Sequence, residues 1–535
     1  MTNRFWAAAA KAAMLVPAAA RGAETPVDGA KAEGSLYVQC DGNPNNMTTG
    51  ESVARLLSLA AVVGLLAPPP ESADASKRKF GADGVAACSA IVDGDKAEGN
   101  AQRRVALILA RALHRIEAKD YDAAIADVGQ ARAEAEAAKL TDDPYFNRSM
   151  GLSFDQVEAA ALVRLGRVEE AQRVSLAAAG RFGHSLSPLL NLNNYAALAP
   201  IGDDADIDYT KAVARLFPGL IDGAAARLEE LSRFDESANM RADLVAHHSV
   251  GKDKEGKPRL PSSLSVARAT LAQALAGQWE TAAASADRAR SIDAARLADG
   301  KPEDMAIRLQ ASEVLDLYEV LLLATGGNLD GARRKFTARS RWLAPSFGAV
   351  MAANRLLYDG ASPAERTGQL AMPASALWQE RSDTTRAELL AGDSDNKSLF
   401  HLIKPRIPAS AFEAQSRTVW RVDKSRIFLK PDKQADPDSA DEGLKIAMLY
   451  GVAGNVALDA MMLHAALDAR AQGKKGFTFT PVFNQYLAAL VRAGDPGDAA
   501  MPDALFLDAD AVIAALSPVI PDPATLKARR AVKSK

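Results

Sequence analysis

The sequence predicts a mostly α-helical protein: a solenoid of helical hairpins in the middle, a small α/β module near the C-terminus, and a short cysteine-containing segment near the N-terminus. Three observations predict this architecture. A six-residue signature recurs five times, and its final alanines are 47, 53, 58 and 50 residues apart, a period typical of stacked helix pairs. Both cysteines lie ahead of the first copy. Beyond about residue 350, short β-type runs alternate with helical patterns.

Composition agrees with a helical protein that has a large core. The chain has 535 residues, of which 48% are hydrophobic and 24% charged, so it can bury extensive apolar surface and is not disordered as a whole. Alanine is abundant and aromatic residues make up 6%, which favours closely packed helices over a sheet sandwich. The net charge of −3 argues against a nucleic-acid partner, which would need a basic face.

Residues 1–20 have the pattern of a signal peptide. Arg4 and Lys11 supply positive charge, a short apolar stretch follows at 12–17, and small residues occupy 18–20, at the spacing of a cleavage site. This pattern predicts a periplasmic or otherwise exported protein. The alternative is a frayed alanine-rich helix on a cytoplasmic chain.

Residues 21–98 form an N-terminal segment that contains Cys40 and Cys88. In an oxidising compartment the two could close one disulfide, worth about 3–4 kcal/mol in the chain-entropy model, while two buried free thiols are the alternative. Residues 35–40 have the composition of a short strand. We expect an apolar helix at 56–67 to be buried in protein, because twelve helical residues are too few to span a bilayer.

The repeated signature reads glycine or lysine, any residue, a large apolar residue, an acid, any residue and alanine. Each copy is expected at the turn between two helices, with its acid in the first turn of the second helix, where the helix dipole favours negative charge. The copies are Lys119–Ala124, Gly166–Ala171, Gly219–Ala224, Gly277–Ala282 and Gly327–Ala332.

Small residues are expected where the two helices of each pair cross. They lie at the end of each signature and, in three copies, also seven positions before its first residue. The alanines expected to pack the repeats are Ala112, Ala124, Ala159, Ala171, Ala212, Ala224, Ala282 and Ala332.

These turns and alanines resemble the tetratricopeptide repeat, in a degenerate form of the bacterial envelope type. The resemblance spans 99–350, roughly half the chain. It departs from the family in its period near 50 instead of 34 residues, in lacking the aromatic of the first helix in most copies, as Arg115 shows, and in a repeat-ending proline found only near Pro345. The resemblance implies stacked hairpins with a concave surface that binds a protein or peptide.

The remainder of the chain is expected to form a connecting region and a small module. Residues 351–416 connect the repeats to an α/β module at 417–526. This module is expected to have strands at 418–422, 426–430 and 477–480, a long helix at 444–472 and a last helix at 501–519. If its strands are parallel, the crossover should be right-handed. The basic tail, 527–535, has the pattern of a frayed end that could contact anionic lipid.

Motifs for chemistry are sparse. The chain's histidines lack the helical spacing of a zinc protease, and its glycine pairs lack the lysine of a phosphate-binding loop, so we expect no metal site and no cofactor. His464 has Asp459 and Asp468 nearby. A carboxylate-oriented histidine could act as a general base, while a solvated helix face or a structural hydrogen bond is the alternative.

The sequence therefore predicts a non-enzymatic, exported scaffold that binds a protein or peptide partner in the cell envelope. We expect no nucleic acid and no membrane span in the mature chain, with peripheral membrane contact left open. Two alternatives remain: an envelope hydrolase with its active site in the C-terminal module, and a structural component of an envelope complex. The first would require His464, or another titratable group, to lie in a pocket beside a nucleophile and an acid.

Overall fold

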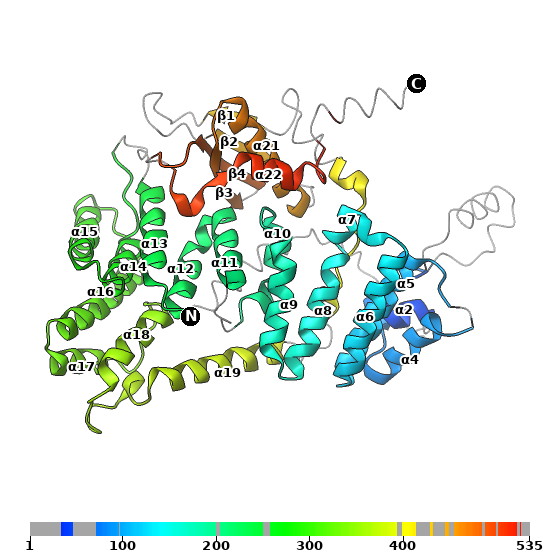
Figure 1. Ribbon diagram of the computed structural model, residues 1–535, viewed down its shortest axis with the longest axis horizontal. Helices are drawn as coiled ribbons and strands as arrows, with labels where there is room; N and C mark the ends of the chain where they lie inside the picture. Colours follow the sequence, from blue (N-terminus) through cyan, green and yellow to red (C-terminus); the bar gives the residue numbers. More distant parts are fainter. Residues whose placement is uncertain are drawn as a thin grey trace. The chain divides into compact units, whose positions relative to one another are not determined.

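The computed structural model describes residues 34–45, 71–95, 97–198, 204–249, 257–392, 399–413, 428–431, 444–448, 454–483, 487–498, 501–521 and 525. The expected signal peptide, the apolar helix at 56–67, the strand at 418–422 and the basic tail lie outside these residues. The described part is mainly helical, with a small antiparallel sheet near the C-terminus (Figure 1). None of its helices combines the length and hydropathy needed to cross a membrane.

The chain divides into two compact units. Of the described residues, the cysteine unit comprises those within 34–175 and 387–408, and the sheet unit comprises those within 176–386 and 409–525. The first division falls within helix α9 (Val168–Gly180), and another falls within α19 (Ala374–Gly392).

Helices of the cysteine unit pack mainly against their neighbours along the chain. α2 contacts α4, α4 contacts α5, α5 contacts α6, and α6 contacts α8. Two arginine-mediated contacts tie residues after 399 to the same unit, because Arg406 donates to Gln102 and Asp143. The helices are α2 (Leu36–Asp41), α4 (Gly81–Val92), α5 (Ala101–Glu117), α6 (Tyr121–Ala137), α7 (Pro144–Asn147) and α8 (Gly151–Arg164), with short 3₁₀ turns η2 (Ala75–Lys77), η3 (Leu140–Asp142) and η6 (Leu399–Leu402).

The prediction of a strand at 35–40 is wrong, because Leu36–Asp41 form helix α2 and Ser35 is its N-cap. Ser35 caps the helix by accepting a hydrogen bond from the Val38 N–H, and Gly42 ends it at a φ of 82° with its N–H on the Val38 carbonyl. These caps satisfy backbone groups at both ends. The buried pair Val38 and Cys40 produced an alternation that imitated a strand.

The sheet unit begins with a helical array. α12 contacts α13, α13 contacts α14, α14 contacts α15 and α16, and α16 contacts α17, whereas α18 contacts α12, α14 and α16 together (Figure 1). One large apolar core joins α14 to α18. The helices are α10 (Leu186–Ala196), α11 (Asp204–Leu216), α12 (Ile221–Glu230), α13 (Phe234–Ser249), α14 (Ser263–Leu275), α15 (Trp279–Ala298), α16 (Met305–Thr325), α17 (Leu329–Thr337) and α18 (Phe347–Tyr358), with η4 (Pro218–Leu220) and η5 (Gly368–Leu370).

The sheet has five strands in the order β1-β2-β4-β3-β5, all antiparallel. Helix α21 packs on β3 and β4, and α11 also contacts β3. On β3, Phe477, Thr478 and Phe479 are all buried, so both faces of this strand are covered. The elements are β1 (Phe428–Pro431), β2 (Leu444–Met448), α21 (Gly454–Ala471), β3 (Gly476–Phe483), β4 (Leu487–Gly494), η7 (Asp503–Leu505), β5 (Leu507–Asp508) and α22 (Ala509–Leu516).

The sheet corrects the expected module in three respects. Residues 507–508, expected within the last helix at 501–519, form β5, and that helix, α22, begins only at Ala509. Residues 444–448 do not begin the long helix but form β2, which pairs with β1 and β4. Pairing partners on both sides override a run that local propensity leaves ambiguous. Helix α21 connects β2 to β3, which run in the same direction but do not pair, because β4 lies between them and is antiparallel to both. The expected strand at 477–480 lies within β3.

All five signature copies lie at turns between consecutive helices. Four of the turns, at Lys119, Gly166, Gly277 and Gly327, share one geometry with a left-handed first residue. In each, this residue's N–H donates to the carbonyl three residues back, and the next N–H donates to the carbonyl five residues back, which is the Schellman pattern of a helix C-terminus. Gly219 differs, since it lies within η4.

A further turn of the same geometry was missed at Ser232, between α12 and α13. Ser232 has a φ of 61°, and the N–H groups of Ser232 and Arg233 make the same two hydrogen bonds. Phe234 and Asp235 occupy the apolar and acidic positions, and buried Ser237 replaces the alanine. The third hairpin with this turn is therefore α12–α13.

Candidate binding groove

The alanines expected to pack the repeats lie in helices on either side of these turns. Ala212 is half-buried in α11, and the other seven are buried. They therefore contribute to helix packing and are unavailable to a ligand. The buried seven are Ala112, Ala124, Ala159, Ala171, Ala224, Ala282 and Ala332.

Cys40 and Cys88 form a disulfide between α2 and α4, so the alternative of free thiols does not hold. Both cysteines are fully buried. The carbonyl oxygen of Cys40 accepts a hydrogen bond from His114 Nε2 at 2.7 Å, which joins the disulfide to α5. The disulfide and this hydrogen bond together hold α2 against α4 and α5.

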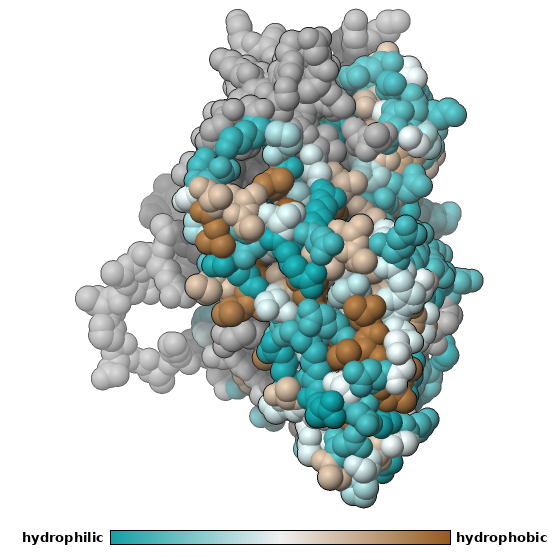
Figure 2. All heavy atoms as spheres, turned by 90° about the vertical axis from the view of Figure 1, so that its left-hand side faces the viewer, coloured by the Kyte–Doolittle hydropathy of each residue, from teal (hydrophilic) through white to brown (hydrophobic). Residues whose placement is uncertain are grey.

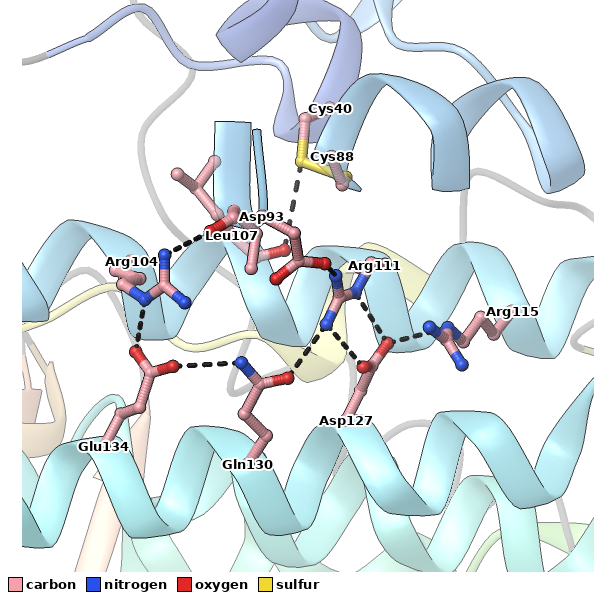
Figure 3. A network of polar contacts seen from close by, with 11 residues as sticks. Cys40, Cys88, Asp93, Arg104, Leu107, Arg111, Arg115, Asp127, Gln130 and Glu134 are labelled. Carbon is pink, nitrogen blue, oxygen red and sulfur yellow. Dashed lines mark hydrogen bonds and ion pairs between the residues drawn. A yellow bond between two sulfur atoms is a disulfide. The ribbon is translucent and has the colours of Figure 1, made fainter. Parts of the chain in front are cut away.

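Close to the disulfide lies a network of charged residues (Figure 3). Buried Arg111 donates to Asp127 at 2.7 and 3.0 Å and also to Asp93 and Gln130. Burial lowers the pKa of Arg111, but the hydrogen bonds and charges of Asp127 and Asp93 outweigh it, so the pKa is raised overall. Arg115 also pairs with Asp127, at 2.9 Å. The charges offset one another, which gives this network a structural role in joining α4, α5 and α6.

The histidine proposed as a general base is buried. His464 lies on α21 beside buried Leu463 and Ala465, and burial lowers its pKa while Asp468 partly opposes the change. Asp459 accepts a hydrogen bond from Ser185 at 3.1 Å. This acid thus holds α21 to the start of α10.

A groove of about 740 Å³ lies in the sheet unit, between the end of α12, the second half of α18 and the start of α19. Its volume is within the range of about 300–1,000 Å³ typical of ligand sites. The lining residues are Glu230, Leu231, Met351, Asn354, Arg355, Tyr358, Asp359, Pro373, Ala374, Ser375, Trp378 and Gln379.

A hydrogen bond from Ser346 to Glu229 positions α18 beside α12. Glu229, buried at the end of α12, accepts hydrogen bonds from Arg241 and from Ser346. Ser346 is also the N-cap of α18, since its hydroxyl accepts from the Ala349 N–H. Gly348 then lies directly on α12, where a Cβ would overlap the backbone of Glu229 and Glu230. Close packing of the two helices thereby sets one wall of the groove.

Trp378 brings an aromatic ring from α19 to the lining of the groove. The rings of Trp378 on α19 and Phe347 on α18 stack with centroids 6.2 Å apart. The Arg381 guanidinium lies 4.5 Å from the Phe347 ring centre and pairs with Glu230 at 2.9 Å. Because the Arg381 guanidinium contacts both Phe347 and Glu230, the half-buried Trp378 stacked on Phe347 has a defined environment and can present its ring to a ligand.

Asn354 supplies an unsatisfied acceptor in the lining of the groove. Its side chain is fully buried, and its Nδ2 donates to the carbonyl oxygens of Gln369 and Met372 at 2.7 and 3.0 Å. These two bonds fix the amide orientation. Among the described residues its Oδ1 has no hydrogen-bond partner, and a buried acceptor left unpaired costs roughly 1–3 kcal/mol.

The rim of the groove is polar and carries both signs of charge. Exposed Arg355 donates to the Ser232 hydroxyl at 3.1 Å, and Asp359 is also exposed. The Arg366 guanidinium lies over the ring of Tyr358, 4.5 Å from the centre of that ring. The groove thus combines apolar contact, hydrogen-bonding groups and balanced charge.

This composition is suited to binding. No group of three His, Cys, Asp or Glu residues in the described part of the chain is arranged to hold a metal ion. The lining contains no histidine or cysteine, so it offers neither the Ser–His nor the Cys–His pair used in many covalent mechanisms.

Another exposed surface is less continuous. The side of the molecule with α15, α16 and α17 faces the viewer in Figure 2, where hydrophobic patches are separated by hydrophilic residues. Met305 and Leu309 at the start of α16 are each 63% exposed. Scattered apolar side chains of this kind are common on soluble proteins.

The sequence did not indicate Trp378 or Asn354. Both lie in the region expected only to connect the repeats to the module. Comparisons with family models, with curated proteins and with solved structures find no match for this chain.

Proposed function

We propose that the protein is an exported, non-catalytic scaffold of tetratricopeptide-like hairpins that binds a protein or peptide partner in the cell envelope. The observation that carries this proposal is the groove, whose lining includes a tryptophan with a defined environment and a residue with an unpaired buried acceptor. Aromatic anchors in partly desolvated sites contribute strongly to protein recognition.

The disulfide supports export. Cytosolic proteins rarely keep structural disulfides because the compartment is reducing, whereas periplasmic and secreted proteins form them. The Cys40–Cys88 bond thus agrees with the signal-peptide pattern of residues 1–20, and each observation favours the same compartment.

The turns support a repeat architecture. Hairpins closed by the same hydrogen-bonded turn, with contacts that mostly follow chain order inside each unit, are the elements from which a helical solenoid is built. Stacked hairpins offer extended surfaces for a macromolecular partner, which favours a scaffold over a small-molecule enzyme.

Affinity capture tests this function. The mature chain is immobilised and exposed to envelope extract beside Trp378→Ala, with Trp279→Ala on α15 as a matched control outside the groove. We expect a specific partner to be retained by the wild type and by Trp279→Ala and to be lost with Trp378→Ala. Cell fractionation should place the processed chain outside the cytoplasm.

Other outcomes favour the alternatives. Retention of the partner by Trp378→Ala would show that the groove is not where the partner binds. Recovery of no specific partner over a range of salts and detergents would reject the scaffold. Cleavage of envelope polymers by the purified chain would favour the hydrolase, and recovery only within a fixed stoichiometric assembly would favour a structural component.

A further inference from the structure

The start of α19 adds hydrogen-bond donors to the groove. Ala374 and Ser375 form the first turn of a 19-residue helix and line the groove. The carbonyl oxygen of Pro373 already accepts from the N–H groups of Ala376 and Leu377. The N–H groups of Ala374 and Ser375 have no intrahelical acceptor, and within the described residues no other backbone acceptor meets them.

Asn354 is an independent observation of the opposite polarity. Its amide nitrogen faces the loop that carries Gln369 and Met372, so its oxygen points away from that loop. Residues with unpaired backbone donors on α19 and a residue with an unpaired acceptor on α18 therefore line the same groove, and neither kind of group finds a partner in the described protein.

The balance of charges around the groove disfavours a strongly ionic ligand. The Glu230 carboxylate is paired with Arg381 at 2.9 Å and with Arg227 at 3.4 Å. The exposed charges that remain on the rim, Arg355 and Asp359, are opposite in sign. A free carboxylate or a phosphate would meet Asp359 as well as Arg355, whereas a neutral amide suits this balance.

We propose that the groove binds an extended internal segment of a protein partner through its backbone. One peptide carbonyl accepts from the Ala374 and Ser375 N–H groups, a peptide N–H donates to Asn354 Oδ1, and a bulky apolar side chain packs on Trp378 and Met351. This inference rests on the proposed function. It adds the class of ligand, an extended peptide segment, and the contacts that recognise it.

The test uses an array of end-blocked nonapeptides of random sequence, probed with the full mature chain. Binders should share a bulky apolar residue and tolerate varied neighbours. In a backbone N-methylation series on one binder, methylation at a single position should weaken binding about tenfold, the effect of one lost hydrogen bond, while methylation elsewhere changes it little.

A protein variant tests the donors. Ala374→Pro removes one N–H at the first helical position, where proline is tolerated, and should weaken the same peptide about tenfold. Met305→Pro, which removes the equivalent N–H at the start of α16, is the matched control and should bind like wild type. Thermal unfolding shows whether both variants fold. If Ala374→Pro does not fold, the methylation series still tests the inference, because it uses the wild-type protein.

Several results would overturn the inference while leaving the proposed function intact. One is a Trp378-dependent partner from envelope extract combined with no array binder. Another is equal affinity for every methylated peptide, which would show apolar contact alone. Binding only to peptides with a free terminal carboxylate would indicate an anion site. Failure of the capture experiment itself would count against the proposed function.

Discussion

Gly348 shows how one missing side chain determines the packing of two helices. It lies on the backbone of Glu229 and Glu230, where no Cβ fits without movement. Because α12 and α18 both line the groove, the same contact controls the position of the wall that these two helices form.

We therefore expect Gly348→Ala to reduce both stability and partner binding. Overpacking typically costs about 1–3 kcal/mol, which exceeds the gain of up to about 1 kcal/mol from replacing a helical glycine. Urea unfolding measures the change. Gly129→Ala in α6, where a Cβ meets nothing within 4 Å, is the control and should raise stability by about 0.5–1 kcal/mol. A more stable Gly348→Ala would contradict the close contact.

His247 on α13 should make folding sensitive to mild acid. Burial, His248 and Arg492 lower its pKa from 6.5 to about 4, and its Nε2 lies 3.4 Å from the Thr480 hydroxyl on β3. Between these pH values the unfolded chain takes up a proton that the folded chain does not, so stability falls as pH falls. The loss from this residue should reach about 2 kcal/mol between pH 7.5 and 5.

Urea unfolding at several pH values, compared with His247→Gln, measures this contribution. The variant should lose stability less steeply between pH 7.5 and 5. Burial also lowers the pKa of His184 and His464, so a smaller slope should remain in the variant. Identical slopes for the two proteins would show that His247 is accessible to protons in the folded state.

The sequence predicts the role of some single residues but not of others. Cys40 and Cys88 were recognisable as a possible pair because they are the two cysteines of the chain. Asn354 and Trp378 were not, since their meaning arises from the approach of α18 and α19. A buried asparagine looks like any polar residue in a sequence until its partners are known.

At the scale of elements, the turn signature was the most informative pattern. A left-handed residue, an apolar residue, an acid and a small residue each have a local physical reason, so the turns could be located without tertiary information. The copy at Ser232 was missed because serine replaces both glycine and alanine there. β2 was misread because its partners β1 and β4 lie elsewhere in the chain.

The left-handed turns lead to a paired prediction. Lys119 is exposed at a φ of 64°, a conformation that costs a non-glycine residue roughly 1 kcal/mol. Lys119→Gly should therefore raise the free energy of unfolding by about 1 kcal/mol, and Gly277→Ala, with open space around its Cβ, should lower it by a similar amount. Chemical denaturation measures both, and changes of the same sign in the two variants would contradict the shared geometry.

At the scale of the molecule, the two compact units are stabilised differently. Each unit has a buried arginine that pairs with acids, Arg111 in the cysteine unit and Arg241 in the sheet unit, but the cysteine unit also has the Cys40–Cys88 disulfide. Such differences could not be read from composition, because both units have the same alanine-rich helical character. They depend on which helices each chain segment contacts.

This difference predicts that losing the disulfide weakens one unit selectively. The cysteines are 48 residues apart, and opening a loop of that length costs about 4 kcal/mol in the chain-entropy model. In Cys40→Ala/Cys88→Ala, hydrogen exchange should therefore accelerate in α4 and α5 while α14 and α16 keep their protection. Wild type without reductant provides the reference, and Ser291→Ala on exposed α15 controls for substitution alone. Equal acceleration in both sets of helices would mean that the two units unfold as one cooperative body, because the disulfide would then stabilise helices it does not contact.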